Sequence, residues 1–217
     1  MIITEQKPLE EILDSLKGRN KIFIIGCGEC STTCKTGGEK EVLAMKEILE
    51  KNGKTVVGSV IPKAPCIASQ IKTEFAKNRK ALTEAEAILS LSCGLGSQSI
   101  KDNNRMEQVV IPGNNTICMG LMDAQGNFQE KCSACGECLL ALTGGICPVT
   151  LCPKGLLNGP CGGMDKGKCE VDKERDCAWV LIYKELEKNN KLEDFRKIQA
   201  PKDYKKTIRP HKVIAAK

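Results

Sequence analysis

The chain has 217 residues, of which 41% are hydrophobic but only 3% are aromatic, so its core must be built from aliphatic side chains. Its net charge of +6 comes from basic residues that are spread out, without a basic stripe interleaved with aromatics, which argues against nucleic-acid binding. No apolar run approaches the roughly 18 residues of a membrane span, and the start lacks a signal-peptide pattern. We therefore expect a cytoplasmic protein without a membrane span.

The first half of the chain alternates between helical and extended patterns. Apolar residues at helical spacing predict helices over 8–16, 39–51 and 71–82, and a short helix over 100–108. Compact apolar runs predict strands over 21–25, 54–61 and 85–91, and fragments of a fourth strand over 109–111 and 116–118. This alternation predicts an α/β fold, with a small parallel-sheet βαβ domain over residues 1–125.

The composition changes from about Gly126 onward, where Gly, Pro and Cys become frequent. Such a region cannot bury enough apolar area to fold unaided, and metal ligation would supply the missing stability. Helices are expected over 177–186 and 191–198. We predict a metal-stapled, Cys/Gly-rich region with C-terminal helices over 126–199, followed by a basic, extended tail over 200–217 that wraps a partner.

The chain contains 14 cysteines, and in a cytoplasmic protein this density indicates metal or redox chemistry more often than disulfides. Eight of them are Cys132, Cys135, Cys138, Cys147, Cys152, Cys161, Cys169 and Cys177. A Cys-x2-Cys-x2-Cys run followed by a Cys-Pro pair is typical of [4Fe–4S] ligation, although eight residues rather than three separate Cys138 from Cys147. Zinc is the alternative, because similar spacings also form closed tetrahedral zinc sites.

A second group of cysteines follows the ends of the predicted strands. Its members are Cys27, Cys30, Cys34, Cys66 and Cys93. Because ligands bind beyond the carboxyl ends of parallel strands, we expect these thiols to converge there on a cluster or a metal ion. The alternatives are a redox Cys-x2-Cys pair in the manner of thioredoxin, and a set of structural thiols. Cys118 is expected to be a small buried hydrophobe.

Acid–base catalysis has no evident groups in this sequence. His211 is the only histidine, and its place in the basic tail predicts a solvated side chain. No paired acids accompany the thiols. We therefore predict no active site on this chain.

Five strings in the second half carry a family resemblance. They are Cys132-Ser-Ala-Cys-Gly-Glu-Cys, Thr143-Gly-Gly-Ile-Cys-Pro-Val-Thr, Leu156-Leu-Asn-Gly-Pro-Cys-Gly-Gly, Gly167-Lys-Cys-Glu-Val and Asp176-Cys-Ala-Trp-Val-Leu-Ile-Tyr. With them, the chain resembles the MetV family, also called the methylenetetrahydrofolate reductase C-terminal domain family. Members are small, cysteine-rich partners of the flavin-bearing subunit MetF. Gly26-Cys-Gly-Glu-Cys and Pro65-Cys fit the family's N-terminal half with weaker specificity.

The resemblance implies an iron–sulfur electron-transfer subunit of a methylenetetrahydrofolate reductase, in the methyl branch of the reductive acetyl-CoA (Wood–Ljungdahl) pathway. It implies a MetF-like flavoprotein partner that carries the flavin, and electron-input subunits as further partners. It also implies that the eight cysteines from Cys132 to Cys177 are metal ligands, in a chain holding one to three [4Fe–4S] clusters or zinc. The alternatives are a zinc-binding structural or assembly subunit of the same complex, and a thiol oxidoreductase that uses Cys27 and Cys30.

Overall fold

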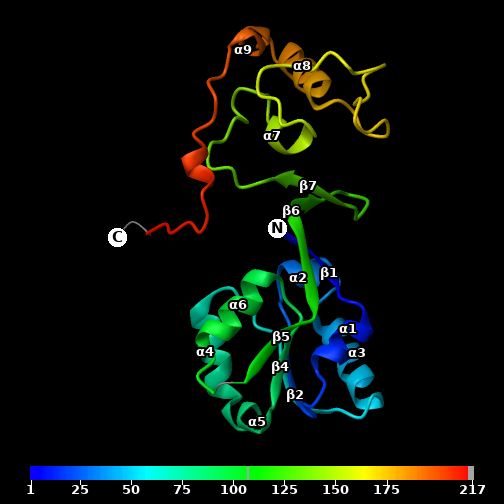
Figure 1. The fold of residues 1–217 in the computed structure, drawn as a ribbon, viewed down its shortest axis with the longest axis vertical. Coiled ribbons are helices and arrows are strands. Elements are labelled where there is room, and N and C mark those ends of the chain that lie inside the picture. Colours follow the sequence, from blue (N-terminus) through cyan, green and yellow to red (C-terminus); the bar gives the residue numbers. More distant parts are fainter. Residues whose placement is uncertain (107, 215–217) are drawn as a thin grey trace. The chain divides into compact units, whose positions relative to one another are not determined.

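The computed structural model describes residues 1–106 and 108–214, and the chain divides into two compact units, Met1–Cys118 (unit 1) and Met119–Lys217 (unit 2). Unit 1 contains a parallel sheet covered by helices, and unit 2 is a cysteine-rich region with a well-formed helix (Figure 1). The predicted α/β class is therefore confirmed. In the described residues, no helix combines the length and the apolar character needed to cross a bilayer.

The sheet of unit 1 has four parallel strands in the order β3-β2-β4-β5. The strands are β2 (Lys21–Ile25), β3 (Thr55–Val60), β4 (Ala87–Ser90) and β5 (Val109–Pro112). All four residues of β4 and the last four of β2 are buried, as expected for central strands covered on both faces. This double burial explains why these strands are continuous apolar runs rather than alternating ones.

Helices cover both faces of this sheet. The helices are α1 (Leu9–Ser15), α2 (Cys30–Thr33), α3 (Glu39–Lys51), α4 (Ala68–Lys77), α5 (Arg79–Glu84) and α6 (Gly94–Asn103). Figure 1 shows α1 and α3 on one side and α4, α5 and α6 on the other. Alternate residues of β2 serve the two cores: Ile22 and Ile24 pack with α1 and α3, whereas Phe23 and Ile25 pack with the other three helices.

Three details of unit 1 differ from the predictions. The helix expected over 71–82 is two helices, which meet at Asn78, whose side chain bonds back to the Glu74 carbonyl. The short helix expected over 100–108 is wrong in position, because α6 begins at Gly94. Glycine has low helix propensity, so the sequence pattern did not indicate the first turn of α6, which contains Gly94 and Gly96. The expected fourth strand is two separate strands, of which only β5 joins the parallel sheet.

A second sheet has the strand order β1-β6-β7. Its strands are β1 (Ile2–Gln6), β6 (Asn114–Met122) and β7 (Phe128–Cys132). β6 pairs antiparallel with β7. The turn between them is held by the Asp123 carboxylate, which accepts hydrogen bonds from the backbone N–H groups of Gln125 at 3.0 Å and Asn127 at 2.8 Å.

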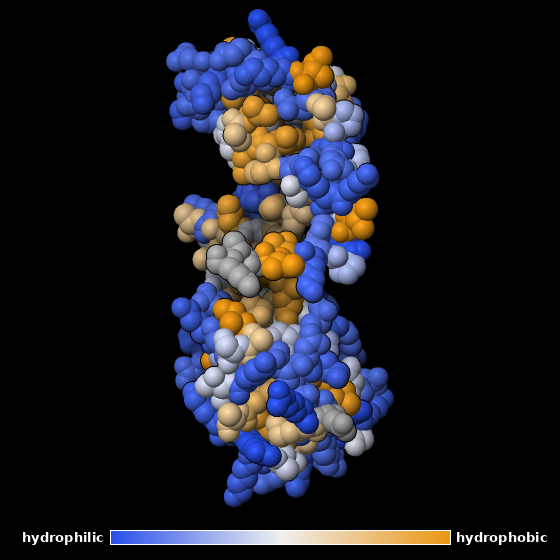
Figure 2. Space-filling view, turned by 90° about the vertical axis from the view of Figure 1, so that its left-hand side faces the viewer, coloured by the Kyte–Doolittle hydropathy of each residue, from blue (hydrophilic) through white to orange (hydrophobic). Residues whose placement is uncertain are grey.

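Unit 2 has a small core around one helix. Its elements after β7 are α7 (Pro148–Leu151), α8 (Ala178–Lys188), α9 (Leu192–Arg196) and a short 3₁₀ helix (Tyr204–Thr207). The buried side chains of α8 pack against Phe195 of α9, whose ring lies edge-on to Trp179 at 5.7 Å between centroids. Figure 2 shows hydrophilic residues over much of the surface with apolar patches between them, and unit 2 leaves large apolar side chains such as Val171 and Ile198 exposed.

Candidate metal centres

Three neighbouring strands of the parallel sheet run into cysteines at their carboxyl ends. Cys27 comes shortly after β2, Cys66 lies in the loop after β3, and Cys93 follows β4. Because β2 lies between β3 and β4, these three chain segments leave the same edge of the sheet side by side. Cys30 opens α2 close to Cys27, and Cys93 is the N-cap of the ten-residue helix α6.

Cys66 interacts electrostatically with three of these thiols. Shielding of its sulfur from water raises the pKa of Cys66, and Cys93, Cys27 and Cys30 raise it further, because neighbouring thiolates repel. Thiols are soft donors that transition metals bind, so these four side chains are candidate metal ligands. We call Cys27, Cys30, Cys66 and Cys93 the sheet-edge quartet.

The Ile2 backbone N–H donates to Cys30 Sγ at 3.4 Å, and Cys34 also contacts β1. Cys34 is buried, and its Sγ accepts a hydrogen bond from the Thr4 backbone N–H at 3.5 Å and donates to the Ile2 carbonyl at 3.7 Å. The side chain of Cys34 therefore attaches the end of α2 to β1. Its predicted role as a ligand stays a prediction, with these strand contacts as the alternative use of the thiol.

Gly26 allows two loops to meet beside Cys27. A Cβ atom at Gly26 would lie 2.5 Å from the Gly37 carbonyl oxygen and 2.8 Å from a methyl group of Val42. The Cys27 backbone N–H also donates to the Gly37 carbonyl at 2.8 Å. Close packing at Gly26 and the hydrogen bond to Gly37 thus fix the backbone around Cys27, without a contribution from the Cys27 side chain.

The variant Gly26→Ala is expected to lower the free energy of unfolding by about 1–3 kcal/mol, the usual cost of overpacking. Chemical unfolding followed by circular dichroism measures this loss. Gly94→Ala is the matched control, because a Cβ there would meet only the Thr116 hydroxyl oxygen, at 3.3 Å. Equal unfolding midpoints for the two variants would contradict the close packing at Gly26.

In unit 2, a cavity gathers four further thiols. Its lining includes Cys152, Cys161, Cys169 and Cys177, which we call the cavity quartet, together with apolar side chains such as Met164, Val171 and Trp179. Two backbone hydrogen bonds shape the loop that carries two of these cysteines: Cys169 N–H donates to the Arg175 carbonyl at 2.9 Å, and Cys177 N–H to the Gly167 carbonyl at 2.8 Å. Cys177 is also the N-cap of α8.

The remaining four cysteines of unit 2 make separate hydrogen bonds or lie exposed. Cys132 Sγ accepts from the Ala134 N–H at 3.4 Å, Cys147 Sγ donates to the Thr150 hydroxyl at 3.6 Å, and Cys138 is exposed. Ala134 (φ 53°) and Gly136 (φ 77°) are both left-handed, and they curl the Cys132–Cys138 loop. The structure thus shows the curled loop but does not join these four sulfur atoms in one site.

Cys135 has the most polar surroundings of this loop. Partial burial acts to raise the pKa of Cys135, but the Glu137 backbone, the hydrogen bond from Lys202 and its positive charge together hold the pKa below its usual value. The Lys202 ammonium donates to Cys135 Sγ at 3.1 Å. A thiol in this environment favours its thiolate form, which is the form that binds metals.

The donor chemistry of both quartets fits a metal ion or an iron–sulfur cluster. No disulfide joins the cysteines that the structure describes. As placed, no three cysteine, histidine, aspartate or glutamate side chains of the described ranges form a ready-made site for a single metal ion. In a zinc site, each thiolate sulfur lies about 2.3 Å from the ion. In a [4Fe–4S] site, the ligand sulfurs lie farther apart, because the cluster itself occupies the space between them. Loading either quartet would therefore draw its loops together, which couples metal binding to folding.

One comparison with known proteins gives a match. Residues 111–205 match the family model described as "Methylene-tetrahydrofolate reductase C terminal". This segment belongs to that family. The match confirms the resemblance that the cysteine strings carry. No curated protein and no solved structure matches the chain.

The methylene-tetrahydrofolate reductase C-terminal segment includes the cavity quartet, the Cys132–Cys138 loop and Cys147. The sheet-edge quartet lies outside it, so its assignment depends on the geometry of unit 1 alone. Cys118 lies inside the segment, and the prediction that it is buried is wrong. It is half-buried within β6, because this strand belongs to the second sheet and not to the parallel one.

The family segment also contains a residue that the sequence pattern did not indicate. Lys202 lies in the tail that was predicted to be extended and to wrap a partner, yet it is only 9% exposed and contacts Cys135. The tail also forms the 3₁₀ helix Tyr204–Thr207. No periodicity marks this stretch, and its lysines look equivalent in the sequence. His211 is exposed, as expected.

Proposed function

We propose that this chain is an iron–sulfur electron-transfer subunit of a methylenetetrahydrofolate reductase, and that it delivers electrons to the flavin of a MetF-like catalytic subunit in the methyl branch of the reductive acetyl-CoA pathway. The observation that carries the proposal is the gathering of thiols from separate loops into two quartets. The family of residues 111–205 supplies the link to the reductase.

Several residues would hold the clusters and shape their surroundings. The sheet-edge quartet would ligate one centre in unit 1, and the cavity quartet another in unit 2. Cys132, Cys135, Cys138 and Cys147 remain for a third. An iron–sulfur cluster supplies one-electron transfer, which a flavin on a partner can accept. Apolar side chains such as Trp179 line the cavity, and the hydrophobic surroundings of a cluster help to set its reduction potential.

A zinc-binding structural or assembly subunit is the second candidate. The observation in its favour is that the cavity quartet adjoins the small core of unit 2, where Cys177 and Cys152 pack with Trp179. A closed tetrahedral zinc site would stabilise such a core without moving electrons. A thiol oxidoreductase has less support, because Cys27 is only 4% exposed and interacts electrostatically with Cys66.

An electron-transfer assay separates the two leading candidates. The chain and a MetF-like flavoprotein are purified separately without oxygen, and the flavin absorbance is followed after mixing the reduced, desalted chain with the oxidised flavoprotein. We expect the flavin to be reduced in a single turnover, at least tenfold faster than with a zinc-loaded sample of the same chain. Stable association with equal, slow reduction in both samples would favour the zinc subunit instead.

A further inference from the structure

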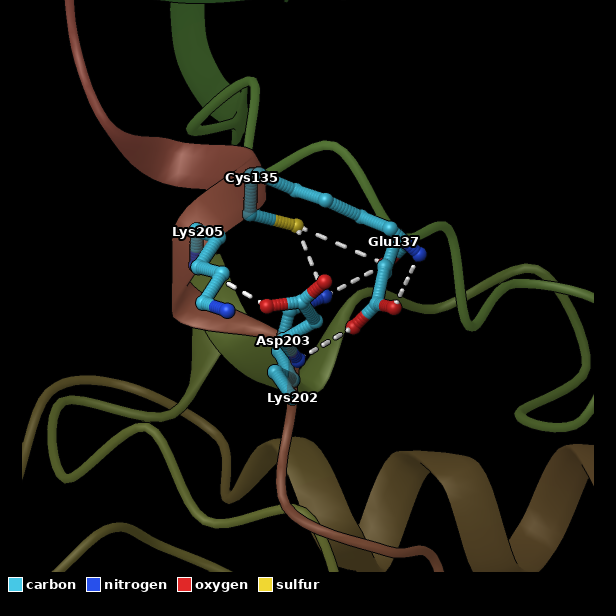
Figure 3. Close-up of polar contacts among 6 residues, drawn as sticks. Cys135, Glu137, Lys202, Asp203 and Lys205 are labelled. Atoms are coloured by element: carbon cyan, nitrogen blue, oxygen red, sulfur yellow. Dashed lines mark hydrogen bonds and ion pairs between the residues drawn. The ribbon is translucent and has the colours of Figure 1, made fainter.

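The C-terminal segment 199–206 crosses the Cys132–Cys138 loop and is attached to unit 2 at two points. The first is Asn158, whose side chain donates to the Gln199 carbonyl at 2.9 Å and accepts from its N–H at 2.6 Å. The second is Glu137, whose carboxylate accepts from the Asp203 N–H at 3.0 Å and from the Lys206 ammonium at 2.6 Å. Figure 3 shows the contacts around Glu137. We call residues 199–206 the strap.

The strap packs so closely against the loop at Gly136 that no side chain would fit between them. A Cβ atom at Gly136 would lie 2.9 Å from the Lys206 carbonyl oxygen and 3.0 Å from the Lys206 Cβ atom. Gly136 is also left-handed, so glycine is needed for both reasons. The backbone of the strap is therefore in close contact with the loop at Gly136, the residue after Cys135.

Lys202 is the residue that the strap brings to the thiol. Its ammonium donates to Cys135 Sγ at 3.1 Å and to the Glu137 carbonyl at 2.5 Å (Figure 3). Within the described residues, no carboxylate forms a salt bridge with Lys202. The Glu137 carboxylate nevertheless attracts Lys202 electrostatically. The sulfur of Cys135 is the side-chain atom that the Lys202 ammonium contacts directly.

We propose that Lys202 is a positioning residue for the metal centre that includes Cys135, and that its N–H···S contact raises the reduction potential of that centre. The inference rests on the proposed iron–sulfur function. Reduction would add one electron, supplied by dithionite in the titration below, and would make the centre more negative, with no bond formed or broken and no proton required. A hydrogen-bonded cation at a ligand sulfur stabilises that extra charge.

The test compares three variants of the full chain, each purified anaerobically. Lys202→Met removes the charge and keeps the apolar length, and Lys202→Arg keeps a cationic donor. Lys205→Met is the matched control, because Lys205 is exposed on the same strap and only its backbone N–H bonds to Asp203. Iron is counted, and the midpoint potentials are measured by dithionite titration followed by EPR.

We expect Lys202→Met to lower the midpoint potential of one EPR signal, Lys202→Arg to restore much of it, and Lys205→Met to match the unchanged chain. Unchanged potentials in Lys202→Met with full iron content would overturn the role of Lys202 and leave the proposed function intact. An unchanged chain that holds no iron would overturn the proposed function itself. If Lys202→Met loses iron, retention of iron by Lys202→Arg supports the role of the cation, and loss by both variants refutes it.

A second readout does not depend on iron. Glu137→Gln removes the charge that holds the Asp203 N–H and the Lys206 ammonium, so hydrogen exchange across residues 199–206 should become faster. Lys205→Met should leave this exchange unchanged. Equal exchange in the Glu137→Gln variant and the unchanged chain would show that the strap is not held at this point, which would contradict the inference.

Discussion

Trp179→Ala is expected to lower the free energy of unfolding of unit 2 by about 3–5 kcal/mol, the usual cost of deleting a large buried aromatic side chain. Trp179 is 5% exposed, packs edge-on against Phe195, and donates from Nε1 to the Leu156 carbonyl at 3.2 Å. The variant therefore leaves a cavity and an unsatisfied carbonyl in a core that has few other large side chains. Urea unfolding followed by circular dichroism measures the loss. Tryptophan fluorescence is unsuitable, because Trp179 is the only tryptophan and the variant removes it.

Ile198→Ala is the control for this prediction. Ile198 is 88% exposed, and surface substitutions away from special features usually change stability by less than about 0.5 kcal/mol. Similar unfolding curves for the two variants would show that the core of unit 2 is not organised around Trp179. If the Trp179→Ala variant also kept the metal of the cavity quartet, the metal centre rather than the apolar core would be what stabilises unit 2.

Cys93→Ser is expected to remove the whole metal centre of unit 1, with all of its iron, rather than a fraction of it. A four-ligand cage that loses one thiolate binds its cluster weakly, and serine is a poor substitute for a soft sulfur donor. Serine is also a favourable N-cap, so α6 should persist. Iron and acid-labile sulfide per chain, with circular dichroism as a check on folding, measure the effect.

Cys34→Ser is the matched control, since Cys34 is bonded to β1 and a hydroxyl can make similar hydrogen bonds. This variant should keep the iron of unit 1. If Cys34→Ser lost as much iron as Cys93→Ser, the assignment of Cys30 and Cys34 would have to be reversed or shared, and the sheet-edge quartet would be wrong as defined.

The parallel sheet was largely predictable because its central strands are apolar on both faces. The run Lys21–Ile25 and the amphipathic pattern of α3 have the same bounds in the structure as in the prediction. β1 and β7 were not predicted, because each is short, partly polar and stabilised by pairing with β6 rather than by its own pattern. Pairing with β6, rather than local sequence propensity, thus determines that these two segments form strands.

The position of three cysteines just after neighbouring strand ends was predictable for a similar reason. Strand ends that follow one another in a parallel sheet must meet at one edge, and Cys27, Cys66 and Cys93 follow strand ends. The grouping of the downstream cysteines was not predictable, because spacing does not determine which loops fold over one cavity. The Lys202–Cys135 contact spans 67 residues of sequence, and nothing local distinguishes Lys202 from its neighbouring lysines.

The most direct test of the iron–sulfur account is an oxygen-free preparation of the chain in which iron, acid-labile sulfide and zinc are counted and EPR spectra are recorded after dithionite reduction. The account predicts iron and sulfide in nearly equal amounts, little zinc, and a signal from a reduced cluster. A colourless preparation that contains zinc but no iron and gives no EPR signal would contradict it.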